Sequence, residues 1–504
     1  MTVTEPDADR SEMSTEQLDT LALVIDLIRA HGHITRPELV RRAGLGRAVV
    51  TQRVSELIDL GVAEDGDPAP STGGRPAREI RIRAGAGSIL AAELGATSIS
   101  VALSDLACRT RLEREEPMDV AAGPEACLAQ LERLFDGLLS HSQDPCPPLW
   151  GIGVGLPGPV EFATGRPIAP PIMPGWDDYP VRERLRERHG VPVWVDNEVN
   201  VMALGELRAG LAAGERHALY VKIGTGIGAG LISNGRLHRG AQGCAGDLGH
   251  LAVVDDESML CRCGNRGCLE ALAGGAALGR DGERAAREGR SPFLEAVLEQ
   301  NGTVTARDVA SGAQSGDRAS YDLLARAGTL IGETLASVVS FFNPSLILVG
   351  GGVAESGDLL MANIREATYR RALPLATRDL RLTRSVLGER SGLTGAAYMA
   401  CDELFSHALL PAWIAYGSPV GLAEQIQPAQ RPFPRTAGLW EHPVAHNRSR
   451  CLLAAYAGGH ERLHAGRDRV PAPSDPRPHG DRRARWPAAR DPGDLRLQRG
   501  GGRH

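Results

Sequence analysis

The amino-acid sequence predicts a multidomain protein, with a small helical module at the N-terminus followed by a larger α/β region. The length of 504 residues exceeds that of one ordinary domain, and 42% of the residues are hydrophobic, so more than one core can form. Residues 14–60 carry apolar side chains at helical spacing, whereas from about residue 86 short apolar runs alternate with helical patterns. These two patterns place the boundary near residue 84.

Charge and composition restrict the function classes. The net charge of −6 gives no overall sign of a protein that binds polyanions, so a nucleic-acid partner must be argued from a local motif. The N-terminus is polar and acidic without an apolar signal segment, and no apolar run approaches the roughly 20 residues that span a bilayer. We therefore expect a cytoplasmic protein with no membrane partner and with reduced cysteines. Lys222 is the only lysine, which we interpret as GC-rich coding bias toward arginine.

Three short helices and two short strands are predicted in the N-terminal module. Ser14 and Thr35 each begin a helix-capping pattern, with Gln or Glu three residues later. A tight turn at residues 44–46 precedes the third helix. Residues 62–63 and 80–82 are predicted strands on either side of a loop rich in glycine and proline. This order of elements is typical of a winged helix-turn-helix.

We assign the winged helix-turn-helix to residues 14–84, after a disordered segment of residues 1–13, and its third helix would enter the major groove of operator DNA. The expected contacts are Arg47, Ala48, Thr51 and Gln52 at base edges, Arg36 and Arg53 at phosphates, and Arg75 in a minor groove. A three-helix packing or dimerisation module is the alternative, because residues 14–60 carry equal numbers of acidic and basic side chains. One recognition helix makes a small interface, so a dimer on a two-fold site is expected.

The α/β region is predicted from six short apolar runs that are typical of strands. They are residues 89–94, 98–103, 151–156, 193–195, 218–223 and 346–349, with helical patterns at 124–140 and 319–340. Three glycine-containing loops follow strands, and such loops suit phosphate because their backbone N–H groups bind anions. Their residues are Glu93, Gly95 and Thr97 in the first loop, Gly224, Thr225 and Gly226 in the second, and Gly350 and Gly351 in the third. One such loop alone is an ordinary turn, whereas three in this order favour a binding site.

Two further groups of polar residues point to ligands. Asn197 and Glu198 follow a predicted strand, and a carboxamide beside a carboxylate suits a ligand rich in hydroxyl groups. The segment 247–270 holds three of the nine cysteines, behind His250. In a reducing compartment such a cluster favours a metal site over a disulfide.

With these motifs the chain resembles the ROK family (repressors, open reading frames, kinases), in its regulator branch with an N-terminal winged helix. The resemblance covers roughly residues 14–410. It is most specific from Gly224-Thr225-Gly226 through Gly240, Gly243 and Gly246-Asp247-Leu248-Gly249-His250 to Cys261-Arg262-Cys263-Gly264-Asn265-Arg266-Gly267-Cys268-Leu269-Glu270. It implies a two-lobed actin/hexokinase-like domain of RNase H-like lobes, which we place at residues 85–418, in a homodimer or homotetramer.

The resemblance also implies a metal and a ligand. A structural Zn²⁺ would be held by His250, Cys261, Cys263 and Cys268, and one imidazole with three thiolates is by residue type a closed tetrahedral zinc set. A monosaccharide or sugar derivative would lie in the cleft, with its hydroxyls bound by Asn197, Glu198, Asp247, His250 and Glu270.

Several residues depart from the pattern of ROK sugar kinases. Glu198 stands where the kinases carry the Asp that takes the proton of the attacked hydroxyl. Its extra methylene displaces the carboxylate by about 1 Å, enough to cost on the order of 10²-fold in rate. Glu93 replaces another Asp, Asp247 replaces a Glu, and residues 96–98 lack the usual Gly-Thr-Lys. We therefore predict no catalytic residue and vestigial phosphate loops, and leave the binding of ATP and Mg²⁺ open.

The combined prediction is a sugar-responsive transcriptional regulator of carbohydrate-metabolism genes, a repressor released by its sugar. The alternatives are an active sugar kinase with an attached DNA-binding module, and a metal-dependent structural protein without a ligand. Residues 419–504, rich in Arg, Pro and His, are expected to be a disordered basic tail or non-native sequence from out-of-frame GC-rich coding.

Overall fold

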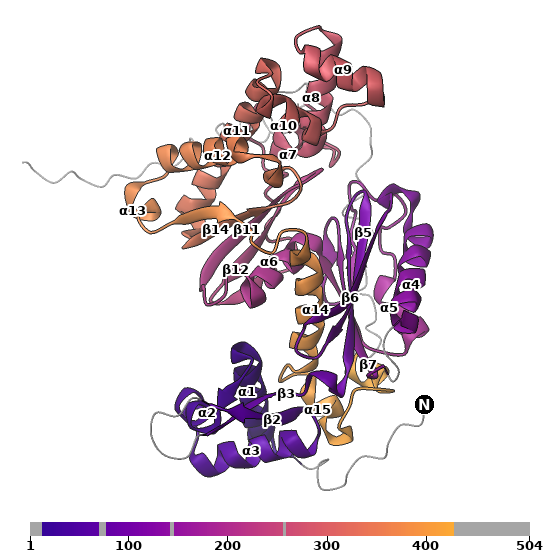
Figure 1. Ribbon diagram of the computed structural model, residues 1–504, viewed down its shortest axis with the longest axis vertical. Coiled ribbons are helices and arrows are strands. Elements are labelled where there is room, and N and C mark those ends of the chain that lie inside the picture. The colour runs from indigo at the N-terminus through magenta and orange to yellow at the C-terminus, as the bar shows by residue number, and fades with distance from the viewer. Residues whose placement is uncertain (1–12, 70–76, 142–145, 256–258, 428–504) are drawn as a thin grey trace, which may run out of the picture. The chain divides into compact units, whose positions relative to one another are not determined.

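The computed structural model describes residues 13–69, 77–141, 146–255 and 259–427 (Figure 1). The predictions of disorder for residues 1–12 and for the tail from residue 428, and the predicted role of Arg75, fall outside the described residues.

The N-terminal module has three helices and one small sheet. They are α1 (Thr15–His31), α2 (Arg36–Ala43), α3 (Arg47–Asp59), β1 (Ile34–Thr35), β2 (Ala63–Pro68) and β3 (Arg78–Ile82). Ser14 and Thr35 cap α1 and α2, since each side chain accepts the backbone N–H three residues later and the residue there reaches back. The sheet is antiparallel in the order β1-β3-β2. The predicted helices and wing strands are confirmed, and β1 is an additional strand.

The first α/β lobe is built on a five-stranded sheet in the order β10-β7-β4-β5-β6. Its strands are β4 (Ser88–Leu94), β5 (Ser98–Asp105), β6 (Thr110–Pro117), β7 (Leu149–Leu156) and β10 (Val193–Asn197). The first three strands run antiparallel, and β7 and β10 are added parallel to β4 on its other edge. Parallel strands require crossovers, which here contain α4 (Pro124–His141) and α5 (Val181–His189). A ribbon of β8 (Val160–Glu161) and β9 (Arg166–Pro167) lies between β7 and α5 in the chain.

The second lobe repeats this topology in the order β13-β12-β11-β14-β15. Its strands are β11 (His217–Ile223), β12 (Ile227–Ser233), β13 (Arg236–His238), β14 (Leu346–Gly350) and β15 (Arg381–Arg384). Again three antiparallel strands are followed by two parallel ones. The helices are α7 (Leu269–Ala273), α8 (Gly275–Arg287), α9 (Pro292–Asn301), α10 (Ala306–Gln314), α11 (Arg318–Phe342), α12 (Asp358–Arg371) and α13 (Pro374–Thr377).

By length and composition alone, α11 could cross a membrane. Half of its most apolar stretch is buried in the lobe, as in a core helix of a globular domain.

The structure also contains short 3-10 turns: η1 (Ala84–Ala86), η2 (Val120–Ala122), η3 (Ala354–Ser356) and η4 (Ile414–Tyr416).

Two helices without predicted counterparts, α6 (Glu198–Ala209) and α14 (Arg390–Leu404), pack against each other between the two sheets (Figure 1). Glycines let their backbones approach closely, because a Cβ on Gly395 would lie 1.8 Å from the Val201 carbonyl oxygen. A Cβ on Gly205 would likewise lie 2.2 Å from the Ser391 carbonyl oxygen. The start of α6 is thereby fixed between the lobes, where the candidate ligand residues lie.

The predicted C-terminal boundary at residue 418 is wrong, because the fold continues to Gln427. After α15 (Leu410–Trp413), the chain forms α16 (Ala423–Ile426), and Leu422 and Ile426 are buried. The side chain of Gln427 exchanges two 2.8 Å hydrogen bonds with the backbone of Val193 on the edge strand β10. The predicted boundary rested on weak periodicity, which helices of four residues do not show.

Candidate ligand and metal site

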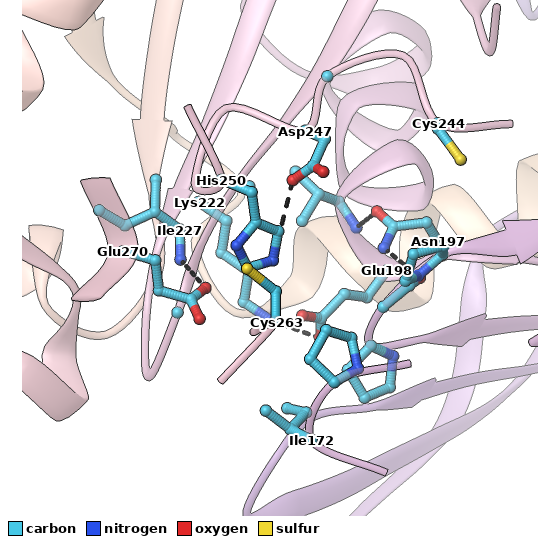
Figure 2. Close-up of a pocket in the computed structure, with 18 of the residues that line it drawn as sticks. Ile172, Asn197, Glu198, Lys222, Ile227, Cys244, Asp247, His250, Cys263 and Glu270 are labelled. Carbon is cyan, nitrogen blue, oxygen red and sulfur yellow. Dashed lines mark hydrogen bonds and ion pairs between the residues drawn. The ribbon is translucent and has the colours of Figure 1, made fainter. Parts of the chain in front are cut away.

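A cavity of about 330 Å³ collects residues of both lobes (Figure 2). All five residues predicted to bind a sugar line it: Asn197, Glu198, Asp247, His250 and Glu270. They come from the start of α6, the loop after β13 and the start of α7, which are distant in sequence. The structure also places Lys222 in this lining, a residue to which the sequence analysis gave no role.

Asn197 ends β10 and caps α6. Its Oδ1 accepts the N–H groups of Val199 at 2.9 Å and Asn200 at 3.3 Å, and its Nδ2 donates to the Gly158 carbonyl at 2.8 Å. These bonds satisfy backbone N–H groups in the first turn of α6 and hold the Asn197 side chain in one orientation. Asn197 therefore offers a ligand its second amide N–H rather than a free carboxamide.

Glu198, the first residue of α6, is paired with a cation. The Lys222 ammonium donates to Glu198 Oε2 at 2.6 Å (Figure 2). The same nitrogen lies 3.8 Å from Glu93 Oε1. Burial raises the pKa of Glu93 to about 7, with Lys222 opposing and Glu198 adding to the rise. Burial also works against the charge on Lys222, but the two carboxylates outweigh it and raise the pKa of the ammonium. The cleft thus holds a positively charged lysine paired with Glu198.

Glu270 is aimed into the cavity by its backbone surroundings. Its Oε2 accepts the Ile227 N–H at 3.0 Å, at the start of β12. A Cβ on Gly226 would lie 2.2 Å from that oxygen, so glycine there leaves room for the carboxylate in its present position. Cys268 is the N-cap of α7, which places Glu270 two residues beyond a candidate metal ligand.

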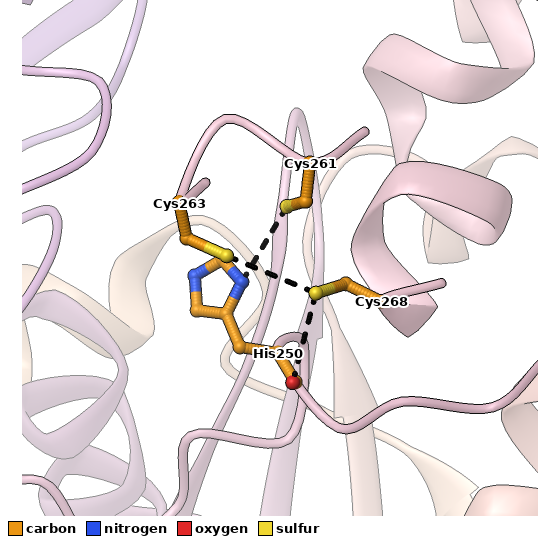
Figure 3. A group of neighbouring side chains, drawn as sticks. All are labelled: His250, Cys261, Cys263 and Cys268. Carbon is orange, nitrogen blue, oxygen red and sulfur yellow. Dashed lines mark hydrogen bonds between the residues drawn. The ribbon is translucent and has the colours of Figure 1, made fainter. Parts of the chain in front are cut away.

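The predicted metal ligands form one cluster (Figure 3). The donor atoms of His250, Cys261, Cys263 and Cys268 all lie within 4.8 Å of one another. The Cys263 and Cys268 sulfurs are 3.8 Å apart, and the Cys261 sulfur is 3.6 Å from His250 Nδ1. Tetrahedral Zn²⁺, with Zn–S near 2.3 Å and Zn–N near 2.0–2.1 Å, requires separations of about 3.8 Å and 3.6 Å. The donors therefore fit a zinc ion in type, number and spacing.

Electrostatics also favours a cation among these donors. Burial, and then the neighbouring thiols, raise the pKa of Cys268 to about 12, and a divalent cation supplies the charge that stabilises thiolates. His250 turns Nδ1 toward the sulfurs, while its Nε2 faces Asp247 Oδ1 at 4.0 Å on the side of the cavity (Figure 2). A metal on Nδ1 would fix the direction in which Nε2 points.

The predicted phosphate loops have structural partners within the fold. The Gly224 and Thr225 carbonyls accept the first N–H groups of α8, from Gly275 at 2.8 Å and Ala276 at 3.0 Å. Gly351 has a φ of +91°, a left-handed conformation that favours glycine. A Cβ on Gly350 would lie 2.1 Å from the Tyr220 hydroxyl oxygen. In the first loop, Gly95 donates to the Ser98 carbonyl and the Thr97 carbonyl accepts from Met118.

The proposed DNA-contacting residues divide into two groups. Arg47, Ala48, Thr51 and Gln52 are exposed on α3, and Arg36 on α2 forms a 3.0 Å ion pair with Asp65. Arg53 is only 5% exposed and pairs with Glu56, so its assignment as a phosphate contact is wrong. The signal was available, because Arg53 lies three residues after Val50 and four before Leu57, on the buried face of the helix.

Comparisons with known proteins agree with this geometry. A model of the ROK family matches residues 89–403. A glucokinase of Halalkalibacterium halodurans is 30% identical over 311 residues, covering 62% of this chain and 94% of the glucokinase. A xylose repressor of Caldicellulosiruptor bescii is 28% identical over 387 residues, covering 76% of this chain and 96% of the repressor. The match to the repressor therefore takes in more of this chain than the match to the glucokinase.

A solved structure supports the fold over a still larger part of the chain. It is described as a ROK family transcriptional regulator, a homologue of the E. coli Mlc protein, and matches with a TM-score of 0.64 at 24% identity. The match covers 82% of this chain and 99% of that chain. The predicted fold class, a helical N-terminal module followed by a two-lobed actin/hexokinase-like domain, is thereby confirmed.

Proposed function

Since the chain belongs to the ROK family, we propose that it is a sugar-responsive DNA-binding regulator of carbohydrate-metabolism genes, and specifically a repressor that its sugar releases. One observation carries this proposal. The same chain contains an exposed helix α3, suited to DNA, and a cleft suited to a sugar, in which the Lys222 ammonium neutralises Glu198. The match to the xylose repressor covers more of this chain than the match to the glucokinase does, and this difference supports the proposal.

The ligand is proposed to be a monosaccharide or sugar derivative bound by Asn197, Glu198, Asp247, His250 and Glu270. Their carboxylates and imidazole suit hydroxyl groups, and all five line one cavity. Structural Zn²⁺ on His250 and the three cysteines would hold His250 and Glu270 in place. The ion would supply folding energy and orientation, since four protein ligands leave no position for a reacting water.

Phosphoryl transfer is the second candidate function, and the glucokinase relative favours it. A kinase needs a base at this position that faces the substrate hydroxyl, but Glu198 Oε2 instead accepts a 2.6 Å hydrogen bond from the Lys222 ammonium. We therefore propose a regulator without kinase activity. Steady ADP production from ATP and a sugar, abolished in Glu198→Gln, would contradict this.

A cytoplasmic homodimer or homotetramer on operator DNA is proposed, with α3 in the major groove and Arg47, Ala48, Thr51 and Gln52 near base edges. Helix α6 connects the cleft to this module. It begins at Glu198 and carries Arg208 near its other end, which pairs with Asp402 at 2.7 Å. Asp402 also accepts a 2.6 Å bond from Arg29 of α1. A sugar that shifts α6 would therefore act on the orientation of α1.

The test combines two assays on the full chain. Thermal-shift screening of monosaccharides identifies ligands, and selection from random DNA followed by a binding assay identifies the operator. We expect a stabilising sugar to weaken operator binding, and a Glu198→Gln variant to lose this response while keeping its DNA affinity without sugar. A stabilising sugar that leaves operator affinity unchanged would refute the sensor function.

A further inference from the structure

Lys222 differs from every other basic position in the chain. It is the only lysine, and every other basic residue apart from histidine is arginine. Coding bias accounts for the arginines, but it does not account for the lysine retained here. Lys222 lies near the end of β11, its side chain is 17% exposed, and its ammonium points toward the start of α6 (Figure 2). An ammonium is a compact point charge, whereas the guanidinium of arginine is a broad planar fork.

The ammonium lies between two acidic side chains of different elements. Glu198 at the start of α6 is 2.6 Å away, and Glu93 near the end of β4 is 3.8 Å away. Both carboxylates are mostly buried, with side-chain exposures of 13% and 11%. The contact joins strand β11 of the second lobe to strand β4 of the first.

The fold is shaped around the carboxylate of Glu93. A Cβ on Gly392, in the first turn of α14, would lie 1.6 Å from Glu93 Oε2. Glycine at position 392 therefore leaves space for the Glu93 side chain in the position that it adopts beside the ammonium. The arrangement of Glu93, Lys222 and Glu198 is accordingly built into the packing of α14 on β4.

We propose that Lys222 is the built-in cation of the cleft: its ammonium fixes Glu198 for ligand binding and excludes a divalent cation from Glu93 and Glu198. Lys222 is in this sense a positioning residue. Two carboxylates from separate elements are the ligands that Mg²⁺ or Mn²⁺ uses when it also brings a nucleotide. A fixed ammonium satisfies the same carboxylates and repels a second cation, so the cleft binds its sugar without a divalent cation.

The proposal extends the proposed function, because it explains how this cleft can hold a sugar yet lack the cation on which phosphoryl transfer depends. Its main test, a titration with a divalent cation, needs neither sugar nor operator. A failure of the test is therefore distinguishable from a failure of the regulatory function.

The experiment is a titration of the zinc-loaded full chain with Mn²⁺ alone, followed by electron paramagnetic resonance of the free ion. We expect no Mn²⁺ site in the cleft of the native protein and a new site in Lys222→Met. An opposite charge within 4–6 Å changes the proton affinity of a carboxyl by about 10- to 1000-fold, so the variant should bind Mn²⁺ at least about tenfold more tightly. Methionine retains the length and apolar character of the lysine stem.

Two matched variants locate the effect. Lys222→Arg keeps a positive charge and should exclude Mn²⁺ as the native protein does. Lys222→Met combined with Glu93→Gln should lose the gained site. Thermal melting and zinc content check that each variant is folded.

Two results would overturn the proposal. One is a folded Lys222→Met protein that binds Mn²⁺ no more tightly than the native protein does. The other is a native Mn²⁺ site that Glu93→Gln abolishes. If Lys222→Met does not fold, sugar affinity of the native protein with and without excess Mg²⁺ decides: equal affinities support the built-in cation, and a requirement for Mg²⁺ refutes it.

Discussion

Replacing Gly226 by alanine tests whether Glu270 contacts the ligand. The new Cβ would lie 2.2 Å from Glu270 Oε2 and 3.0 Å from its Cδ. Favourable contacts between nonbonded heavy atoms begin near 3.5 Å, so the carboxylate must move by about 1 Å. The Gly226 backbone is not in the left-handed region, and alanine should therefore strain the loop little. The substitution therefore changes mainly the direction in which the Glu270 carboxylate points.

The expected loss follows from the hydrogen bonds of that carboxylate. A displaced Glu270 loses its 3.0 Å bond from Ile227 N–H and the alignment that a sugar hydroxyl would use. A hydrogen bond to a charged group contributes about 1.5–3 kcal/mol. The Gly226→Ala protein should therefore bind its sugar about 10- to 150-fold more weakly.

Isothermal titration with the sugar found by thermal-shift screening measures this loss. Gly137→Ala in α4 is the matched control, because a Cβ there meets nothing within 4 Å and alanine is favoured in helices. Zinc content should remain at the native value in both variants, since neither residue is a ligand. Native sugar affinity in a folded Gly226→Ala protein would show that Glu270 does not contact the ligand.

Four further predictions concern the metal, the coupling, the pH dependence and the DNA. Cys263→Ser should lower both bound zinc, measured by elemental analysis, and sugar affinity; unchanged zinc would exclude Cys263 as a ligand. Asp402→Asn should keep sugar affinity but change the effect of sugar on operator binding by roughly 2- to 30-fold, whereas an unchanged response would exclude this connection. Since burial raises the pKa of Glu93 from 4.5 to about 7, its ionisation destabilises the fold progressively between these pH values and fully above them. Glu93→Gln should therefore raise the melting temperature more at pH 8 than at pH 5, and an effect independent of pH would contradict this. Arg47→Ala should weaken operator binding by about 1–3 kcal/mol without unfolding, whereas Arg53→Ala should mainly lower stability, and melting curves with binding assays separate the two.

Elements with local signals were predictable from the sequence. Ser14 and Thr35 cap helices through residues only three positions away, and short apolar runs predicted β4, β5, β7 and β10 of the first sheet and β11 and β14 of the second. The edge strand β6 was not predicted, because its alternating residues are charged and mostly exposed. Helix α6 was not predicted either, since it is buried along most of its length and has no polar face.

The residues of the candidate site were predictable, but their partners were not. The capping role of Asn197 had a local signal, an asparagine directly before a helix. The pairing of Lys222 with Glu198 and Glu93 had none, because it depends on how two sheets and α6 come together. Residue type indicated a ligand rich in hydroxyl groups, and the resemblance to the ROK family indicated a sugar, whereas the pairing of the charged residues required the fold.

The glycine loops and the ammonium lead to different conclusions about nucleotide chemistry. Gly224 and Thr225 bind α8 through their carbonyls, and Gly350 admits the Tyr220 hydroxyl, so these loops are explained by packing whether or not a nucleotide binds. The ion pair of Lys222 and Glu198 is different, because it changes what the cleft can attract. A ligand can shift an equilibrium only by its difference in affinity between two states. A sugar that adds hydrogen bonds to Glu198 while Lys222 holds that carboxylate would stabilise the contact between β11 and α6, and through α6 the state of the DNA-binding module.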